Sequence, residues 1–328
     1  YEEAIEIFTK VKELRPDHQN SHYNLALIKK EQGLNEEAIE LLLKVLDLNP
    51  EHSDAKFNAT QTCNEFGIKL HKKYEYNEAL KYFKIVINLA PSEYLGYFNT
   101  GDTYFELKDF KNAKAYFKKA LQMEPKNEQV HANLGEVYRS QGEIKKSLNC
   151  YNAAIKINPQ NPNNYYNIAI LSNDAGLTDK AEENYKKAIS IDPKHSGSHY
   201  NLALLYELRG QLKEALIVVN NGLQYDISHP ELNYASGMIS LKLGNFKKGW
   251  KSYEYRWKTS PHNKVIWPSP DKPLWRGERR KRVALWREQG IGDEIIFLSL
   301  IPEIKKICTT LSVYVDPRLQ TLCRRVMP

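Results

Sequence analysis

A regular spacing of prolines constrains this chain of 328 residues more than any other feature of its sequence. In its first two thirds, prolines recur at intervals of 34 residues, with one interval of 41 and with Pro162 outside the series: Pro16, Pro50, Pro91, Pro125, Pro159 and Pro193. Each proline follows a segment with helical periodicity and stops it, so each interval has room for two helices and two turns. The pattern predicts helical hairpins that stack side by side into an open solenoid, and it argues against a closed globule.

Small residues recur in phase with the prolines. The eighth position of successive units holds Ala26, Thr60, Gly101, Gly135, Ala169, Ala203 and Gly237. The twentieth position holds Ala38, Ala79, Ala113, Ser147, Ala181, Ala215 and Gly249. Small side chains let the two helices of a hairpin approach closely. With its period of 34, the chain resembles the tetratricopeptide repeat family over residues 1–257. This resemblance implies about seven helix–turn–helix units after a partial first one.

One unit, residues 53–93, has seven extra residues. Alignment of its second helix with that of the next unit places the extra length after Gly67. Seven residues are close to two helical turns, so we expect the first helix of this unit to lengthen without rotating its apolar face.

An asparagine occupies the sixth position of six consecutive units: Asn24, Asn58, Asn99, Asn133, Asn167 and Asn201. The first helices of such repeats line the concave face, and an amide offers both a donor and an acceptor to an extended peptide. The resemblance extends to protein O-linked N-acetylglucosamine transferases, which carry an asparagine ladder that grips acceptor peptides. The row therefore predicts a protein or peptide ligand on the concave face. The alternative is that these asparagines bond neighbouring helices to each other.

Composition changes after residue 257. Residues 1–257 hold 33 basic and 33 acidic side chains, whereas residues 258–290 hold nine basic and three acidic ones. Residues 258–282, which also carry four prolines and two tryptophans, are interpreted as a basic linker between domains. The basic stretch from Arg276 to Arg282 has three interpretations: a solvated linker, a surface that meets acidic lipid or glycan phosphate, or a nucleic-acid-binding patch. The net-neutral solenoid offers no basic stripe to extend such a patch, so we expect no nucleic acid partner.

Residues 283–328 alternate between strand and helix patterns. Residues 283–286 and 311–315 are typical of buried strands, and residues 294–307 are helical in pattern, with Pro302 bending or restarting the helix. A final helix opens at Asp316. The order predicts a parallel βαβ unit. The loop after the first strand lacks the third glycine of a dinucleotide site and the lysine of a phosphate loop.

The string that includes Gln289, Gly290, Gly292 and Asp293 resembles the start of the catalytic region in bacterial repeat-containing glycosyltransferases related to the heptosyltransferases. That resemblance implies a Rossmann-like (GT-B type) α/β domain and substrate contacts by Gln289, Gly290 and Gly292. It makes Asp293 the general base on the acceptor hydroxyl, whereas the plainer interpretation makes Asp293 a helix N-cap. It also implies a nucleotide-sugar donor for the full-length protein. Residues 283–328 cover only one βαβ unit, so we expect no cofactor in this chain and no activity from it alone.

The expected fold is an all-α tetratricopeptide superhelical solenoid followed by the first βαβ unit of a Rossmann-like domain. Two functions remain open: a glycosyltransferase whose solenoid recruits a protein acceptor, and a non-catalytic scaffold.

His18 with His22, and His195 with His199, share helical spacing, but they lack a third ligand, so we expect no metal. Four cysteines without CxxC spacing and no apolar run of membrane-spanning length favour a cytoplasmic protein. The oligomeric state stays open.

Overall fold

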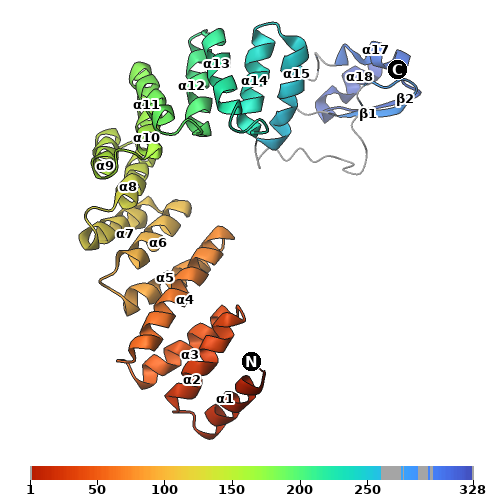
Figure 1. Cartoon of the computed structure of the whole chain (residues 1–328). Helices are drawn as coiled ribbons and strands as arrows, with labels where there is room; N and C mark the ends of the chain where they lie inside the picture. Colours follow the sequence, from red (N-terminus) through yellow and green to blue (C-terminus); the bar gives the residue numbers. More distant parts are fainter. Residues whose placement is uncertain (1, 260–274, 276, 287–294, 296–297, 327–328) are drawn as a thin grey trace.

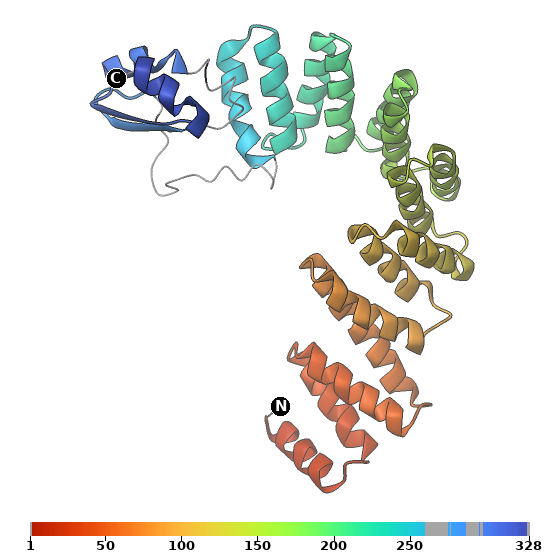
Figure 2. The same cartoon turned by 180° about the vertical axis from the view of Figure 1, so that it is seen from behind.

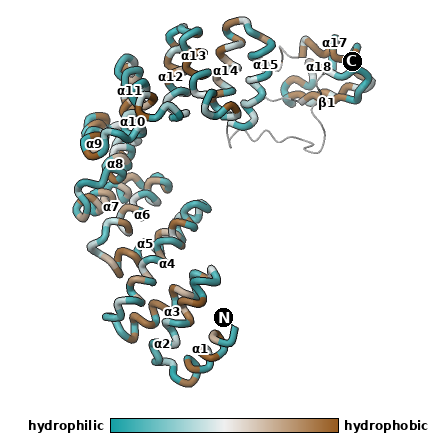
Figure 3. Tube along the Cα trace, in the orientation of Figure 1, coloured by the Kyte–Doolittle hydropathy of each residue, from teal (hydrophilic) through white to brown (hydrophobic). Residues whose placement is uncertain are grey.

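The computed structural model describes residues 2–259, 275, 277–286, 295 and 298–326. Residues 2–258 form paired antiparallel helices that stack into a curved solenoid, seen from opposite sides in Figures 1 and 2. Hydrophobic residues are distributed along every hairpin, as Figure 3 shows, because each hairpin buries its apolar face against its neighbours. The predicted all-α solenoid is confirmed.

Each hairpin consists of an even-numbered first helix and an odd-numbered second helix. The first helices are α2 (Gln19–Glu31), α4 (Ser53–Lys72), α6 (Tyr94–Glu106), α8 (Glu128–Ser140), α10 (Pro162–Asp174), α12 (Ser196–Leu208) and α14 (Pro230–Lys242). The second helices are α3 (Asn35–Leu48), α5 (Tyr76–Leu89), α7 (Phe110–Met123), α9 (Ile144–Ile157), α11 (Thr178–Ile191), α13 (Leu212–Leu223) and α15 (Phe246–Tyr253). Helix α1 (Glu2–Leu14) precedes them, and the 3-10 helix η1 (Glu254–Lys258) follows.

The turn inside each hairpin requires one residue in the left-handed region. Five hairpins place a glycine there, with φ between 72° and 78°: Gly33, Gly142, Gly176, Gly210 and Gly244. The remaining two turns place Tyr74 (φ 66°) and Lys108 (φ 61°) at this position. A Cβ clashes with the backbone in this conformation, so both turns are strained relative to the other five.

Replacing either residue with glycine is therefore expected to stabilise the protein by about 1 kcal/mol. The left-handed conformation costs a residue with a Cβ roughly 1–2 kcal/mol, and the greater freedom of glycine in the unfolded chain offsets part of the gain. Urea unfolding followed by circular dichroism measures the effect for Tyr74→Gly and Lys108→Gly. A lower unfolding midpoint for both variants would contradict this assignment of strain.

The histidines with helical spacing have structural roles. The Nδ1 atoms of His18 and His195 accept hydrogen bonds from the backbone N–H groups that begin α2 and α12, at 3.2 and 3.1 Å. The Nε2 atoms of His22 and His199 contact the carbonyl oxygens of the preceding prolines at 2.8 and 3.0 Å. The part of the chain that the structure describes holds no cluster of three or more metal-ligating side chains.

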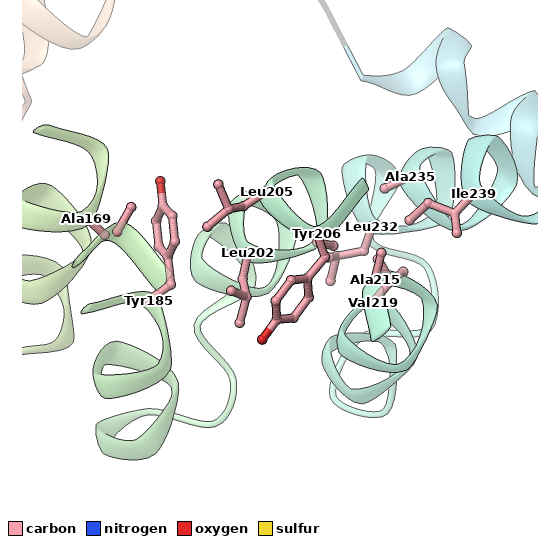
Figure 4. Packing of buried hydrophobic residues seen from close by; sticks show 12 residues of the cluster. Ala169, Tyr185, Leu202, Leu205, Tyr206, Ala215, Val219, Leu232, Ala235 and Ile239 are labelled. Atoms are coloured by element: carbon pink, nitrogen blue, oxygen red, sulfur yellow. The ribbon is translucent and has the colours of Figure 1, made fainter. Parts of the chain in front are cut away.

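Small residues allow the close helix packing that their spacing predicted. An ideal Cβ on Gly101 would lie 2.9 Å from the ring of Phe117, and one on Gly135 would lie 2.7 Å from the ring of Tyr151. The buried residues form several clusters along the solenoid, one of them within the hairpin α4–α5 and the largest across three hairpins. Figure 4 shows the largest of them, in which Tyr185 and Leu202 pack where the hairpins α10–α11 and α12–α13 meet. The core is therefore a series of local contacts along the solenoid.

The long unit lengthens its first helix as expected, since α4 has 20 residues where the other even-numbered helices have 13. The predicted place of the extra length is wrong. An ideal Cβ on Gly67 would lie 2.6 Å from the ring of Phe83, so Gly67 has the role of Gly101 in the next hairpin. The seven extra residues of α4 therefore precede Gly67, and Thr60 does not occupy the small-residue contact within its hairpin.

The described part of the C-terminal segment contains two short parallel strands. Strand β1 (Arg282–Trp286) pairs with β2 (Thr310–Tyr314), and Arg282 is opposite Thr310. Helix α17 (Ile301–Ile307) lies between them in sequence and begins just before Pro302, as the restart predicted. The 3-10 helix η2 (Pro317–Leu319) and α18 (Gln320–Val326) follow, with Asp316 as the N-cap. The strand pair agrees with the predicted order, but it does not by itself establish a Rossmann-like domain.

Burial predicts which cysteines react. All four are free thiols. Burial raises the pKa of Cys63 to about 12 and that of Cys150 to about 11, and only the thiolate is a strong nucleophile. Iodoacetamide at pH 8 is therefore expected to label the half-buried Cys308 and Cys323 first, and Cys63 only after denaturation. Mass spectrometry of timed samples measures this order, and labelling of native Cys63 at the rate of Cys323 would contradict it.

Candidate functional site

The even-numbered helices form the inner layer of the solenoid. Successive members contact each other directly at α4–α6, α6–α8, α8–α10 and α12–α14. Each odd-numbered helix packs instead against its own first helix and the first helix of the next hairpin. Because the even-numbered helices lie closer together, the solenoid curves toward them, and their row forms its concave side (Figure 1). In the described residues, no helix of sufficient length and apolarity to cross a bilayer is present.

The predicted asparagine row lies on this inner layer, and each member is half-buried. Four members donate an Nδ2 hydrogen bond to the preceding inner helix. The bonds join Asn58 to the Tyr23 hydroxyl (3.1 Å), Asn99 to Asn64 (2.6 Å), Asn133 to Asp102 (3.2 Å) and Asn201 to the Tyr166 hydroxyl (2.9 Å). Within residues 2–259, no donor is bonded to the Oδ1 atoms of these four. Each amide thus links two helices and keeps an acceptor.

The row is divided into two parts by α4. Asn58 and Asn201 bond to residues 35 positions earlier, and Asn99 likewise bonds to Asn64 and not to the asparagine of the predicted row. In the register of the later hairpins, the sixth position of α4 is therefore Glu65. Seven residues correspond to about 10 Å along a helix. Asn24 and Asn58 form one short part, and Asn99, Asn133, Asn167 and Asn201 form a longer one.

Aromatic residues accompany the asparagines and were not singled out from the sequence as surface groups. The residue before each asparagine, or its equivalent in the last unit, is aromatic in six of seven units: Tyr23, Phe57, Phe98, Tyr166, Tyr200 and Tyr234. Phe57 is 68% exposed, and the other five are half-buried. The recurrence at the fifth position, on the helices that face the concave side, is the signal that could have identified them. Together with the amides, they give the inner layer both apolar and hydrogen-bonding groups.

Charged side chains bridge the inner helices. Arg139 of α8 bonds Asp174 of α10 at 2.7 Å and Glu136 at 3.0 Å. Burial acts against ionisation of Glu136, but the bonds from Arg139 and the Tyr151 hydroxyl hold the pKa of this carboxyl below its usual value. Lys242 of α14 contacts Glu207 of α12 at 2.6 Å. These bridges fix the spacing of the inner helices.

The predicted catalytic residue, Asp293, and the predicted substrate-binding residues, Gln289, Gly290 and Gly292, lie outside the residues that the structure describes. The described chain on their N-terminal side ends with β1 at Trp286. Their proposed roles therefore remain predictions.

Family comparisons match most of the described hairpins. A model described as "Tetratricopeptide repeat" matches residues 19–52, 96–127 and 162–195, and a second one with this description matches residues 184–217. A "TPR repeat" model matches residues 135–171. Residues 53–95, which contain the long helix α4, fall between two of these matches.

Among curated proteins, the chain is similar to Protein FlbA of Caulobacter vibrioides, with 32% identity over 102 residues. The match covers 30% of this chain and 17% of FlbA, so the chain spans only a small part of that relative.

Solved structures share the fold. Yeast Tom70 superposes with a TM-score of 0.55 and 16% identity, over 78% of this chain and 54% of that one. The APC/C hetero-tetramer Cut9–Hcn1 gives a TM-score of 0.52 and 15% identity, over 80% and 50%. PilF of Pseudomonas aeruginosa gives 0.54 and 13%, over 63% and 94%. At these identities the likeness shows the fold alone. With the period, the packing and the family matches, it establishes that this chain carries tetratricopeptide repeats and provides a scaffold suited to protein–protein interaction.

Proposed function

We propose that the solenoid is a protein-binding module that holds an extended segment of a partner protein against its inner layer. The observation that carries this proposal is the row of half-buried amides with Oδ1 acceptors, all but Asn133 preceded by an aromatic residue, along an open concave surface. An extended peptide presents a backbone N–H at every second residue on one side, which suits such a row of acceptors. Cut9, which has a similar fold, is assembled in a hetero-tetramer with Hcn1.

The amides serve both interpretations that the sequence left open. Their Nδ2 groups bond neighbouring helices, and their Oδ1 atoms stay available for a ligand. Asn167 makes no side-chain hydrogen bond within residues 2–259, so its replacement tests ligand binding with little effect on stability. Asn133 bonds Asp102, a contact worth about 1 kcal/mol.

The test uses a fluorescent library of dodecapeptides and measures anisotropy. For any peptide that binds, the double variant Asn133→Ala/Asn167→Ala is expected to weaken binding about 10-fold or more, with a loss of stability no greater than one hydrogen bond. The control variant Asn149→Ala/Asn221→Ala removes two exposed amides from α9 and α13 and should bind like the unmodified protein. Unchanged affinity with lost stability would assign the row a purely structural role, and a library without any binder would refute the module itself.

A second proposal concerns residues 283–328. The parallel pairing of β1 and β2 around α17 supports a nucleotide-sugar transferase domain that begins here. In that reaction the acceptor hydroxyl attacks the anomeric carbon, the nucleoside diphosphate leaves, and the Asp293 carboxylate takes the hydroxyl proton.

The full-length gene product is then expected to release nucleoside diphosphate from a nucleotide sugar in a coupled assay. Asp293→Asn should slow this release at least 100-fold while leaving the melting temperature unchanged. A full-length product that releases no nucleotide from any donor tested would favour the non-catalytic scaffold.

A further inference from the structure

A cluster of aromatic and acidic side chains lies where α4, α5 and α6 meet. We call it the junction site and define it by Tyr74, Tyr76, Asp102 and Glu106. The rings of Tyr74 and Tyr76 meet edge to face with their centroids 6.2 Å apart. The Tyr76 hydroxyl lies 3.5 Å from Glu106 Oε2. His71 closes one side, since its ring lies 5.1 Å from that of Tyr76 and its Nε2 atom 3.5 Å from Asp102 Oδ2.

The junction site favours a cation. Asp102 and Glu106 are four residues apart on α6, so their carboxylates share one face of the helix. Burial raises the pKa of Asp102, the charge of Glu106 raises it further, and His71 only partly offsets the rise. Lys72 and Lys73 are exposed next to Tyr74, but neither of them is among the groups that act on Asp102. A bound cation would remove the repulsion between the two carboxylates.

The inner helices beside the junction site carry a net negative charge, as the site itself does. The inner helices α6 and α8, next to the junction site, together carry four carboxylates and one arginine, which is paired with Glu136. The outer helices α7 and α9 carry seven lysines and no carboxylate. An oppositely charged ligand is therefore drawn to the inner layer of this part of the solenoid and repelled by its outer layer.

Tyr74 holds an exposed ring at the edge of this surface. Its side chain belongs to a residue that is 79% exposed, and its backbone adopts the left-handed conformation that glycine supplies in five other hairpins. Both features act against stability. The Tyr74 ring contacts Tyr76, whose hydroxyl contacts Glu106, so aromatic and acidic groups adjoin here. This combination is suited to a lysine or arginine side chain, which gains both an ion pair and a cation–π contact.

We propose that the junction site binds a lysine or arginine side chain of a basic segment in the partner protein. This inference rests on the proposed protein-binding function and names the chemistry of its ligand. The basic segment lies along α6 to α12, where the longer part of the asparagine row is. The shorter part, Asn24 and Asn58, is displaced by two helical turns and is not used by this segment.

The probe is a fluorescein-labelled dodecapeptide with four arginines spaced by glycine and serine, compared with the same peptide carrying four glutamates. Anisotropy titrations use the whole chain. We expect the arginine peptide to bind at least 10-fold more tightly than the glutamate peptide. The variant Asp102→Asn/Glu106→Gln should bind the arginine peptide at least 10-fold more weakly than the unmodified protein does. The control Glu183→Gln/Glu214→Gln removes two exposed carboxylates from α11 and α13 and should leave it unchanged.

Two glycine variants separate recognition from folding. Tyr74→Gly should raise the melting temperature and yet lower the affinity for the arginine peptide at least threefold. Lys108→Gly relieves the equivalent strain one hairpin later. It should raise the melting temperature without lowering the affinity for the arginine peptide. Equal losses for the Glu183/Glu214 control, or unchanged affinity for the Asp102/Glu106 and Tyr74 variants, would overturn the junction site. If other library peptides bind without a preference for arginine, the protein-binding function stands and this inference fails; if none binds, both fail.

Discussion

Replacement of Tyr151 by alanine is expected to lower the free energy of unfolding of the central hairpins by about 3–5 kcal/mol, the usual result for a large aromatic core side chain. Tyr151 is fully buried, and its ring lies against α8 at Gly135. Its hydroxyl donates a hydrogen bond to Glu136 Oε2 at 2.9 Å. The substitution therefore removes both the packing between α8 and α9 and a bond to the carboxylate that Arg139 also holds. Urea unfolding followed by circular dichroism measures the loss.

The matched variant Tyr151→Phe keeps the ring and removes only the hydroxyl. Glu136 retains Arg139 as a partner, so this variant should cost about 1 kcal/mol, the net value of one hydrogen bond. Comparable losses for the two variants would mean that the hydroxyl bond, and not the ring, holds the hairpin together.

Gly237→Ala is expected to destabilise the end of the solenoid by about 1–3 kcal/mol, a typical cost of overpacking. An ideal Cβ on this residue would lie 2.5 Å from the backbone nitrogen of Tyr253 and 2.8 Å from its Cα atom. Backbone atoms cannot rotate away as a side chain can, so α14 and α15 must separate. Hydrogen exchange followed by mass spectrometry should show faster exchange in α14 and α15, while exchange in α2 and α3 stays the same.

Gly197→Ala in α12 is the control for helix propensity. An added Cβ there meets only the end of the Tyr166 side chain, at 3.2 Å, and alanine favours a helix over glycine by about 1 kcal/mol. This variant should be neutral or slightly stabilising. A neutral Gly237→Ala variant would show that the two helices adjust without loss.

Most of the solenoid could be predicted from its sequence because proline and glycine mark the ends of its helices. Pro125 and Gly142, for example, flank α8, and the 34-residue period repeats this punctuation. The place of the extra turns in α4 could not be predicted in this way. A continuous helix carries no internal marker, so only the packing of Gly67 against Phe83 reveals which end is additional.

The candidate site was predictable in kind but not in arrangement. The recurrence of asparagine located the inner layer, yet the change of register between Asn58 and Asn99 depends on the position of the extra turns in α4. The junction site depends on Tyr74. The 34-residue period assigns Tyr74 to the turn position that Gly142 and Gly176 occupy, but a tyrosine there gives no indication that the backbone keeps the left-handed conformation. Contacts between groups from α4, α5 and α6 become visible only once the hairpins are stacked.

Because the core consists of local contacts along the solenoid, duplication of one regular hairpin should leave the packing of distant hairpins unchanged. A second copy of residues 128–161 inserted after residue 161 would meet neighbours like those it already has, and would lengthen the solenoid by one unit in the same register. A second copy of residues 53–93 would instead add another displacement of two turns. The solenoid therefore grows in steps of 34 residues, and its one longer unit shifts the register by two helical turns.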